Sequence, residues 1–280
     1  MATGTEEFID VTTADVFLDE IWSKMATISR EANTVFARLV DRRLEPELTK
    51  GQIIHLGNIS SLAAQSKTAG AAVTYETVTE TASDLTVNQH YYAAFAVEDI
   101  IKVQASQPLL SRYTAKIGAA LALQEDDSLA ALVDAFSNTV GTLATDLTDD
   151  NIIRGDQYLN DANCPLDDRH IVVSPAQKAA FLKMDKFVHA DYGRNNAIAT
   201  GNIGNIYGYT VDVSTNVDGT NAAGHDNAMF HRESIAAVTQ IQPKVMSAYD
   251  IDYLATKVVA QQLWGVLEIR DDHGCCMYGA

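Results

Sequence analysis

The sequence predicts an α+β protein that extends well beyond one compact body, and three features of its first half support this. The segment Gly51–Ser137 contains the pattern of a long hairpin, then that of an extended strand, and then that of one long helix. No recognisable catalytic motif interrupts this order. From Gly141 onward the pattern changes to short helices alternating with short strands, which predicts a second, more compact region.

The hairpin is predicted from two arms, Gln52–Leu56 and Ala72–Val78. The segment Gly57–Gly70 between them is rich in Ser, Ala, Gln and Gly and poor in bulky apolar residues. A two-stranded hairpin is only marginally stable alone in water, so one of this length needs another surface to lie on. We expect that surface to be a second copy of the same chain.

Residues 1–48 are predicted to form an N-terminal arm with few internal contacts. The first twenty residues carry six acidic and no basic side chains, whereas Lys24–Lys50 carries six basic and four acidic ones. Thr12 or Thr13 can cap a short helix there, with Asp15 in its first turn. The charge is therefore strongly polarised along this arm.

A long strand and a long helix follow the hairpin. Within Asp84–Val97 alternate positions are mostly apolar, which predicts a strand with one buried face. After Pro108, apolar residues recur at three- and four-residue spacing and predict a helix of about 45 Å, here called the spine helix. Its predicted apolar positions are Leu110, Tyr113, Ile117, Leu121, Leu129, Leu132, Val133 and Phe136.

The end of the chain returns to the first half of the fold. Lys257–Arg270 alternates like the Asp84–Val97 strand, and we expect the two strands to pair and cover the spine helix. Between them the sequence predicts a helix from Thr148, then a turn at Asn163–Asp168 and a buried strand at Arg169–Ser174. A helix from Pro175 and a strand at Tyr209–Ser214 follow. The Gly141–Ala248 region would then be inserted between two parts of one domain.

Composition limits the classes of function. With 280 residues, 47% of them hydrophobic, and only five prolines, the chain should fold around a substantial core. A formal charge of −17 argues against tight nucleic-acid binding, because such binding requires clustered Lys and Arg to neutralise phosphates. Three cysteines, two of them adjacent, do not suggest a disulfide framework and fit a reducing cytoplasm. No signal peptide or apolar run of membrane-spanning length is visible, so we expect a soluble protein with no membrane partner.

Three motifs resemble ligand sites and are better explained as structure. The Gly201–Gly208 segment lacks both the spacing and the following helix of a phosphate-binding loop. Asn216–Asn221 lacks the final Glu of a calcium loop, which predicts a surface turn. His273 lies near Cys275 and Cys276, but adjacent cysteines do not readily place both sulfurs on one ion. We therefore expect no catalytic, cofactor-binding or metal-binding residues and no cofactor.

Other polar and aromatic residues also favour structural roles. The adjacent carboxylates point in different directions on a helix or strand, so they are expected to form solvated faces and caps. Tyr91, Tyr92, Trp22 and Trp264 are expected to anchor a core or an interface. The carboxylate pairs are Asp126 with Asp127, Asp149 with Asp150, Asp167 with Asp168, and Asp271 with Asp272.

The order of these elements resembles that of the major capsid proteins of tailed bacteriophages, the Hong Kong 97-type fold. Local similarities are Arg169–Pro175, Gly201–Val211 and the closing Leu263–Val266. The resemblance covers nearly the whole chain and implies four parts. They are an N-terminal arm at 1–48, an extended loop at 49–83, a peripheral domain with the spine helix at 84–137 and 249–280, and an axial α/β domain at 138–248.

The resemblance also implies a function and its partners. The chain would be a structural protein, not an enzyme, that assembles in the host bacterial cytoplasm into hexamers and pentamers of an icosahedral head. The head would enclose the phage DNA without gripping it tightly, which agrees with the acidic charge. A separate scaffolding protein, a portal and a decoration protein are the implied partners. Lys67 is the only lysine of the loop, and no partner Asn and acid can be placed for it, so we expect no cross-linking between subunits.

Two alternatives remain open at this point. The first is an α+β enzyme with a site in 141–248 built around His170, His189, His225 or His231, which predicts a compact globule. The second is another virion component, such as a tube or decoration protein, which would self-associate into a ring, a helix or a small oligomer.

Overall fold

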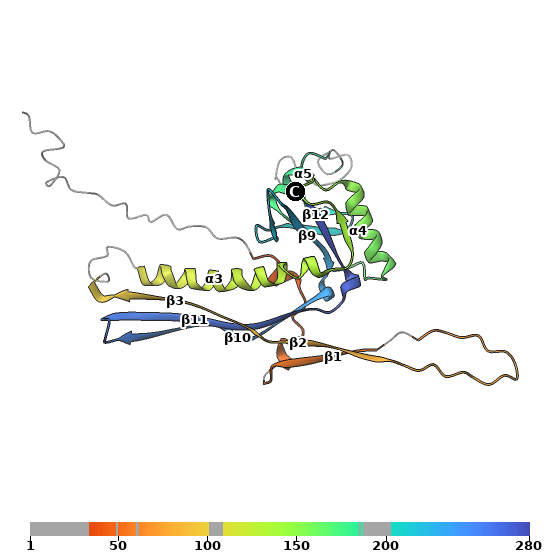
Figure 1. Ribbon diagram of the computed structural model, residues 1–280, viewed down its shortest axis with the longest axis horizontal. Coiled ribbons are helices and arrows are strands. Elements are labelled where there is room, and N and C mark those ends of the chain that lie inside the picture. The colour runs from red at the N-terminus through yellow and green to blue at the C-terminus, as the bar shows by residue number, and fades with distance from the viewer. Residues whose placement is uncertain (1–33, 49, 60–61, 101–108, 185, 187–202) are drawn as a thin grey trace, which may run out of the picture.

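The chain is described here from a computed structural model, which places residues 34–48, 50–59, 62–100, 109–184, 186 and 203–280. The molecule is elongated (Figure 1): helix α3 (Leu109–Ala130) lies along a three-stranded sheet, with a compact body at one end of the helix. A two-stranded hairpin of β1 (Ile53–Ile59) and β2 (Glu80–Thr86) projects in the opposite direction from the sheet. The predicted N-terminal helix near Asp15 lies outside the described residues.

The three-stranded sheet consists of β10 (Ile235–Asp250), β11 (Ala255–Glu268) and β3 (Gln89–Glu98), in that order. The antiparallel pairing of β11 with β3 confirms the predicted return of the chain to its first half. β10 is a sixteen-residue strand that the sequence pattern does not predict. Its register with β11 shifts around Pro243, where a residue without an N–H interrupts the ladder.

The apolar face predicted for the spine helix is confirmed at Ile117 and Leu121 and not at Tyr113. Ile117 and Leu121 are buried against Val258 and Ala260 of β11. Tyr113 remains 48% exposed near the free end of the helix, although its ring lies 5.4 Å from that of Phe95. The helix ends at Ala130, so its 22 residues span about 33 Å, less than expected. Among the described residues, none of the helices is both long enough and apolar enough to span a lipid bilayer.

The single long strand predicted at Asp84–Val97 is instead two strands, β2 and β3. The break falls at Val87, where the backbone passes directly over Gly265 of β11. The two backbones are so close that a Cβ on Gly265 would lie 2.6 Å from the Thr86 carbonyl oxygen. The predicted alternation of buried and exposed positions continues across the break, since Leu85, Val87 and Val97 are all buried.

The second arm of the hairpin is also displaced from its predicted position. β1 pairs with Glu80–Thr86, not with Ala72–Val78. The register places Ile54 opposite Leu85, whose side chain is fully buried in the body, and burial of one face fixes the register of a strand. The Ala72–Val78 segment is exposed and forms no strand.

The compact body is built on a seven-stranded mixed sheet with helices packed against it (Figure 1). The second helix begins at Pro175 as expected, and Ser174 caps it, because its Oγ accepts the Gln177 amide at 3.0 Å. Ile152 and Leu159 bury the apolar face of the first helix. The elements are β4 (Thr139–Gly141), α4 (Asp149–Asp161), β5 (Arg169–Val173), α5 (Pro175–Phe181), β6 (Asn205–Ile206), β7 (Tyr209–Val213), β8 (Gly219–Thr220), β9 (Gly224–His231) and β12 (Gly274–Gly279).

The chain passes between the two sheets more often than the sequence pattern suggests. β10 leaves the compact body at Ile235, and the expected boundary between 248 and 249 falls inside this strand. β12 returns to the compact body and pairs with both β4 and β9. Cys275 and Cys276 of β12 point into two different core clusters, as neighbouring residues on a strand must.

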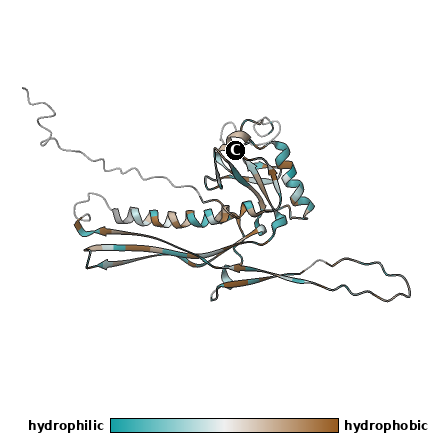
Figure 2. Ribbon diagram, viewed as in Figure 1, coloured by the Kyte–Doolittle hydropathy of each residue, from teal (hydrophilic) through white to brown (hydrophobic). Residues whose placement is uncertain are grey.

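The largest shared core joins the base of the arm to both sheets. Val35, Phe36 and Val40 are buried here with the end of α3, with Phe230 of β9 and with Ile235 of β10. The Phe36 and Phe230 rings are stacked with centroids 6.2 Å apart. Residues 34–48 therefore belong to the folded body, and the expectation that they make few internal contacts is wrong. Figure 2 shows the apolar residues within this region and along the strands.

Candidate assembly surfaces

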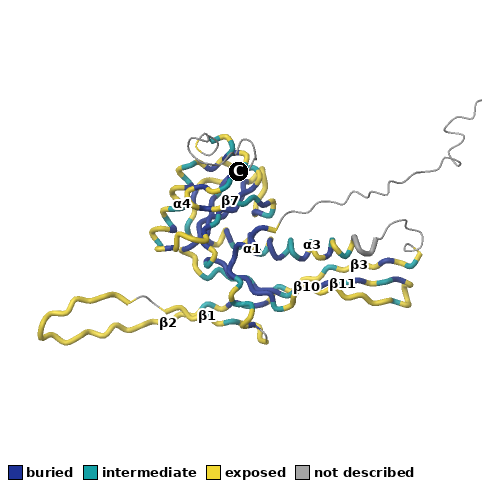
Figure 3. The backbone as a smooth tube through the Cα atoms, turned by 180° about the vertical axis from the view of Figure 1, so that it is seen from behind, coloured by how far each residue is buried: buried dark blue, intermediate teal, exposed yellow. Residues whose placement is uncertain are grey.

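The extended loop between β1 and β2 is the most exposed part of the described chain (Figure 3). Described residues from 62 to 79 form no strand and are all exposed. Tyr75 in its second arm is 90% exposed, although aromatic side chains normally bury a large area. Large exposed apolar side chains are typical of surfaces that another protein covers. Those of the loop and its strands are Ile53, Ile59, Leu62, Val73, Tyr75 and Val78.

The base of this loop is held by the body, so the loop projects in a defined direction. The Val87 amide donates to the Gln52 carbonyl at 2.8 Å, and the Gln240 side chain donates to the Gly51 carbonyl at 2.8 Å. Farther out, the Ala63 amide donates to a Glu76 carboxylate oxygen at 3.2 Å. The polar composition of Gly57–Gly70 predicts this exposure correctly.

A second exposed apolar surface lies at the distal end of the β10–β11 hairpin. Tyr249 is anchored by a hydrogen bond of 2.7 Å from its hydroxyl to Asp99, and Lys257 forms an ion pair with Asp250. The turn between the strands exposes apolar side chains that a soluble monomer would normally cover. In the sequence, this surface is indicated by three apolar residues that stand among acidic ones: Ile251, Tyr253 and Leu254. The exposed set is Val245, Met246, Tyr249, Ile251, Tyr253 and Leu254.

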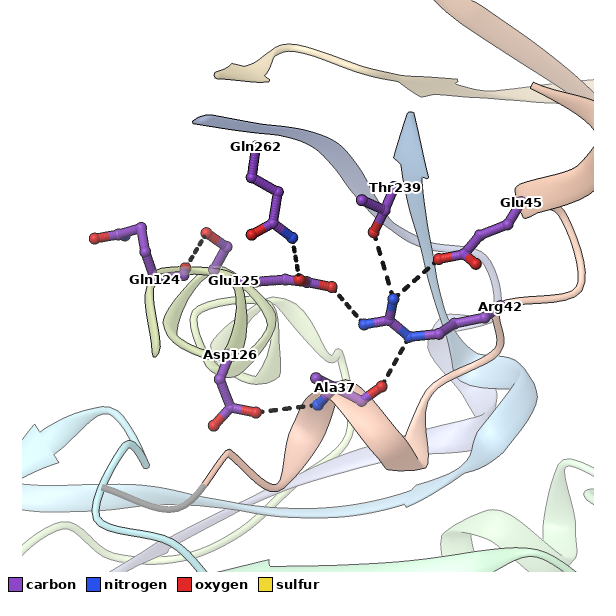
Figure 4. A network of polar contacts seen from close by, with 9 residues as sticks. Ala37, Arg42, Glu45, Gln124, Glu125, Asp126, Thr239 and Gln262 are labelled. Carbon is purple, nitrogen blue, oxygen red and sulfur yellow. Dashed lines mark hydrogen bonds and ion pairs between the residues drawn. The ribbon is translucent and has the colours of Figure 1, made fainter. Parts of the chain in front are cut away.

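A buried polar network anchors the base of the arm beneath these surfaces (Figure 4). The Arg42 guanidinium forms an ion pair with Glu125 of α3 and a second one, at 3.0 Å, with Glu45. Its Nε also donates to the Ala37 carbonyl at 2.8 Å. Gln262 of β11 donates to the other Glu125 oxygen at 2.5 Å. The arm, the spine helix and the central strand of the sheet are thereby joined through one carboxylate.

Asp126, the neighbour of Glu125, holds the start of α1 (Phe36–Leu39) from the other side. Its Oδ1 accepts the Ala37 amide at 3.0 Å, and its Oδ2 accepts the Asn216 side chain at 3.1 Å. Burial raises the pKa of Asp126, and these donors oppose that rise. The prediction of solvated faces and caps is wrong for Asp126, which lies within α3 and is fully buried.

A second set of charges ties the arm to the compact body. The Arg43 guanidinium bridges Asp41 and Glu233, both at 2.7 Å. Burial acts to raise the pKa of Asp41, but the hydrogen bonds from Arg43 outweigh it and lower that pKa. Arg38 forms an exposed ion pair with Asp212.

One junction between the two sheets carries a pair of interacting carboxyl groups. Burial, followed by a hydrogen bond with Asp271, raises the pKa of Glu268 to about 7. Burial would also raise the pKa of Asp271, but the hydrogen bonds from Ser137 outweigh it and lower that pKa. The Ser137 amide donates to Asp271 at 2.6 Å. Glu268 ends β11, and Asp271 opens the turn that leads into β12, so the pair lies where the chain changes sheets.

The motifs interpreted as turns are turns in the structure. Tyr207 and Gly208 both have positive φ and connect β6 to β7, which is the geometry of a two-residue hairpin turn. The turn within Asn216–Asn221 carries β8, which pairs with β9. Trp264 is fully buried and stacks on Tyr91 with centroids 5.0 Å apart, as expected of a core anchor. Trp22 lies outside the described residues.

The histidines considered for an enzyme site have local partners. His170 bonds to Thr210 at 2.6 Å, and His225 bonds to Asn221 at 3.0 Å. His231 accepts the Glu233 amide at 3.2 Å, and His189 lies outside the described residues. The fold brings His231 close to His273 and Cys164, a grouping that the sequence does not predict. Burial raises the pKa of the Cys164 thiol and lowers the pKa of His273.

Comparison with known proteins defines the class to which this architecture belongs. A profile of the family described as phage capsid protein matches residues 89–266, which is more than half of the chain. The chain therefore belongs to the phage capsid protein family. It is a major capsid protein of the tailed-bacteriophage type, with the Hong Kong 97-type fold, and it forms the shell of the virion.

Solved structures support this assignment. A structure of Mycobacterium phage Che8 is 28% identical in sequence, with a TM-score of 0.84 over 93% of this chain and 97% of that chain. The capsid structure of the cyanophage P-SCSP1u has 16% identity and a TM-score of 0.77 over 96% and 94% of the two chains. The mature capsid of bacteriophage PhiM1 has 15% identity and a TM-score of 0.73 over 93% and 91%. Among the curated proteins, no sequence matches this chain.

Proposed function

We propose that this protein forms an icosahedral head of hexamers and pentamers in which the extended loop of each subunit lies across its neighbour. The observation that carries this proposal is the exposed loop with Tyr75 on its second arm, on a base fixed by backbone hydrogen bonds. A loop of this kind gains order only from a surface outside its own subunit. The apolar end of the β10–β11 hairpin offers a second contact between subunits.

The expected division into parts is retained as a proposal with three changes. The arm (1–48), the loop (49–83), the peripheral domain (84–137 and 249–280) and the axial domain (138–248) describe the main sections of the chain. Strand pairing favours moving β10 to the peripheral domain and β12 to the axial domain. Burial favours restricting the arm to residues before 34, because Val35 and Phe36 are core residues.

The partners and the place of assembly belong to the same proposal. The head assembles in the host bacterial cytoplasm with a separate scaffolding protein and a portal, and it accepts a decoration protein. It encloses DNA without gripping it, which a formal charge of −17 favours. The protein has a structural role without catalysis, and its subunits are not cross-linked. Denaturing electrophoresis of purified particles should then release single chains.

Negative-stain microscopy of the expressed protein tests the proposal. We expect closed particles, or rings of five and six subunits, for the native sequence. Tyr75→Asp should reduce their yield strongly while leaving the unfolding midpoint unchanged, because the side chain is 90% exposed in the single subunit. Leu166→Asp is the matched control, since Leu166 is 78% exposed on the compact body. Compact monomers at every concentration, or equal yields for Tyr75→Asp and the native protein, would contradict the proposal.

A further inference from the structure

Three side chains with metal-binding chemistry meet at one end of the seven-stranded sheet. Cys164, His231 and His273 each place one ligand atom within 4.8 Å of the other two. Their exposed fractions are 6%, 5% and 5%, so all three are buried. None of them belongs to the exposed assembly surfaces described above.

The topology of the sheet explains why the two histidines are neighbours. β9 ends at His231, and β12 begins at Gly274, immediately after His273. Because Gly274 pairs with Phe230 in this antiparallel ladder, His231 and His273 occupy the next opposing positions. Their rings are perpendicular, with centroids 6.0 Å apart.

The turn that carries Cys164 is held against them by Arg169. Arg169 is buried, and it donates to the Cys164 carbonyl at 2.7 Å and to the Pro165 carbonyl at 2.6 Å. It also forms an ion pair with Asp156 at 3.0 Å. The Cys164 amide continues this anchoring by donating to the last turn of α4. The backbone that carries all three side chains is therefore held in place. A metal centre depends on such surrounding contacts to orient its ligands.

One polar atom in this cluster lacks a partner in the described part of the chain. Nδ1 of His273 is buried and makes no hydrogen bond there. Native proteins satisfy most buried nitrogen atoms, so such an atom needs an explanation. In His231, Nδ1 accepts the Glu233 amide at 3.2 Å, so the ring proton is on Nε2 and must leave that nitrogen before Nε2 can bind a metal.

We propose that Cys164, His231 and His273 bind one Zn²⁺ ion that fastens this end of the compact body. A thiolate with two imidazoles is a ligand set that zinc prefers. Tetrahedral zinc with bonds of about 2.0–2.3 Å places its ligand atoms about 3.3–3.6 Å apart. Because the three atoms lie within 4.8 Å of one another, each pair needs to close by at most about 1.5 Å, through side-chain rotation. Water completes the fourth position.

Binding involves a simple exchange of protons and hydrogen bonds. The Cys164 thiol loses its proton to solvent, and its sulfur becomes a ligand. In His231 the ring proton moves to Nδ1, so the long hydrogen bond from the Glu233 amide is exchanged for a coordinate bond at Nε2. A cavity of about 290 Å³ that His231 lines together with Arg43 and Asp168 gives the ion a path from solvent.

Cobalt and zinc titration of the full-length, tag-free protein tests this site. We expect Co²⁺ to bind at one ion per subunit and to produce a thiolate-to-cobalt charge-transfer band, which Zn²⁺ then removes. Cys164→Ser and His273→Gln should each weaken Zn²⁺ binding at least about tenfold. His90→Gln is the matched control, because His90 is an exposed histidine of β3 and should leave binding unchanged.

The native protein alone can overturn the proposal, which protects the test against variants that fail to fold. Absence of the charge-transfer band in native protein, at metal concentrations well above those of the subunit, would show that Cys164 is not a ligand. Unchanged Zn²⁺ affinity in folded Cys164→Ser or His273→Gln would contradict the site equally. A second expected result is that a chelator lowers the melting temperature of the metal-loaded native protein and not that of Cys164→Ser.

Discussion

Arg42 shows how a single residue can connect three elements of this fold. Its guanidinium lies between Glu45 and the buried Glu125, whose second oxygen is held by Gln262 (Figure 4). Removing one partner of a buried ion pair leaves the other charge without compensation, which costs more than the pair itself contributes.

We therefore expect Arg42→Ala to lower the free energy of unfolding by about 3 kcal/mol. Urea denaturation of unassembled subunits measures this change. Arg38→Ala is the control, because the Arg38 side chain is 60% exposed and its ion pair with Asp212 should contribute less than about 1 kcal/mol. Similar losses for the two variants would mean that the Arg42 network is no more important than a surface pair.

Glu268 gives the junction between the sheets a defined pH dependence. Its pKa of about 7 in the folded subunit exceeds the ordinary value of 4.5, so the folded state binds the proton more tightly than the unfolded state. Stability therefore falls as the pH rises from about 4.5 to about 7, and it falls no further above that range. The full shift corresponds to about 3 kcal/mol, and solvent screening of this half-buried group reduces the effect to about 1–2 kcal/mol.

The neutral variant Glu268→Gln should lack this part of the pH dependence. We expect it to match the native subunit at pH 4.5 and to exceed its free energy of unfolding at pH 8. Denaturant titrations at both pH values compare the two proteins. An identical difference between them at the two pH values would show that Glu268 does not titrate in this range.

At the scale of elements, the spine helix provides a test of its buried face. Ile117→Asp places an unpaired carboxylate against Val258 and Ala260, and we expect it to cost about 4 kcal/mol or more. Ala120→Asp changes an exposed position of the same helix and should cost less than about 1 kcal/mol. Soluble yield and melting temperature distinguish the two, and equal values would contradict the assigned face.

The extended loop should change its accessibility when subunits associate. Lys67 lies in the exposed part of the loop, so trypsin should cut there rapidly in unassembled subunits. In particles, a neighbouring subunit should cover the loop and slow the cleavage at least tenfold, because association stabilises the ordered state. Mass spectrometry of the fragments over time measures both rates. Equal rates would mean that the loop does not contact its neighbour.

The sequence predicts elements well where one face is buried in the same subunit, as Ile117 and Leu121 of α3 illustrate. Sequence-based prediction fails where contacts between residues far apart in the sequence determine the element. The break after Thr86 depends on the approach of Gly265, which is distant in sequence. β10 contains Pro243 and an exposed outer half, so its pattern does not resemble a strand. The cluster of Cys164, His231 and His273 likewise depends on long-range contacts: the pairing of β9 with β12 joins the two histidines, and Arg169 holds the turn that carries Cys164.

At the scale of the whole molecule, the arm has a boundary that a deletion series can locate. Deleting residues 2–33 should leave a folded subunit that no longer forms shells, because the core residues begin at Val35. Deleting through Val40 removes Val35, Phe36 and Leu39 from the shared core and should prevent folding. Near-ultraviolet circular dichroism reports folding, and microscopy reports assembly. Normal shells from the shorter deletion would show that the arm is dispensable.

Completion of both large sheets depends on strands β11 and β12, which come late in the described chain. β11 is the central strand of one sheet, and β12 lies between β4 and β9 in the other. A ribosome-bound chain that lacks both strands has two sheets with a gap in the middle, so neither sheet can close before residues 255–279 emerge. Nascent or prematurely terminated subunits consequently lack the surfaces on which shell contacts depend. We therefore expect chains that stop before residue 255 to be excluded from the growing head.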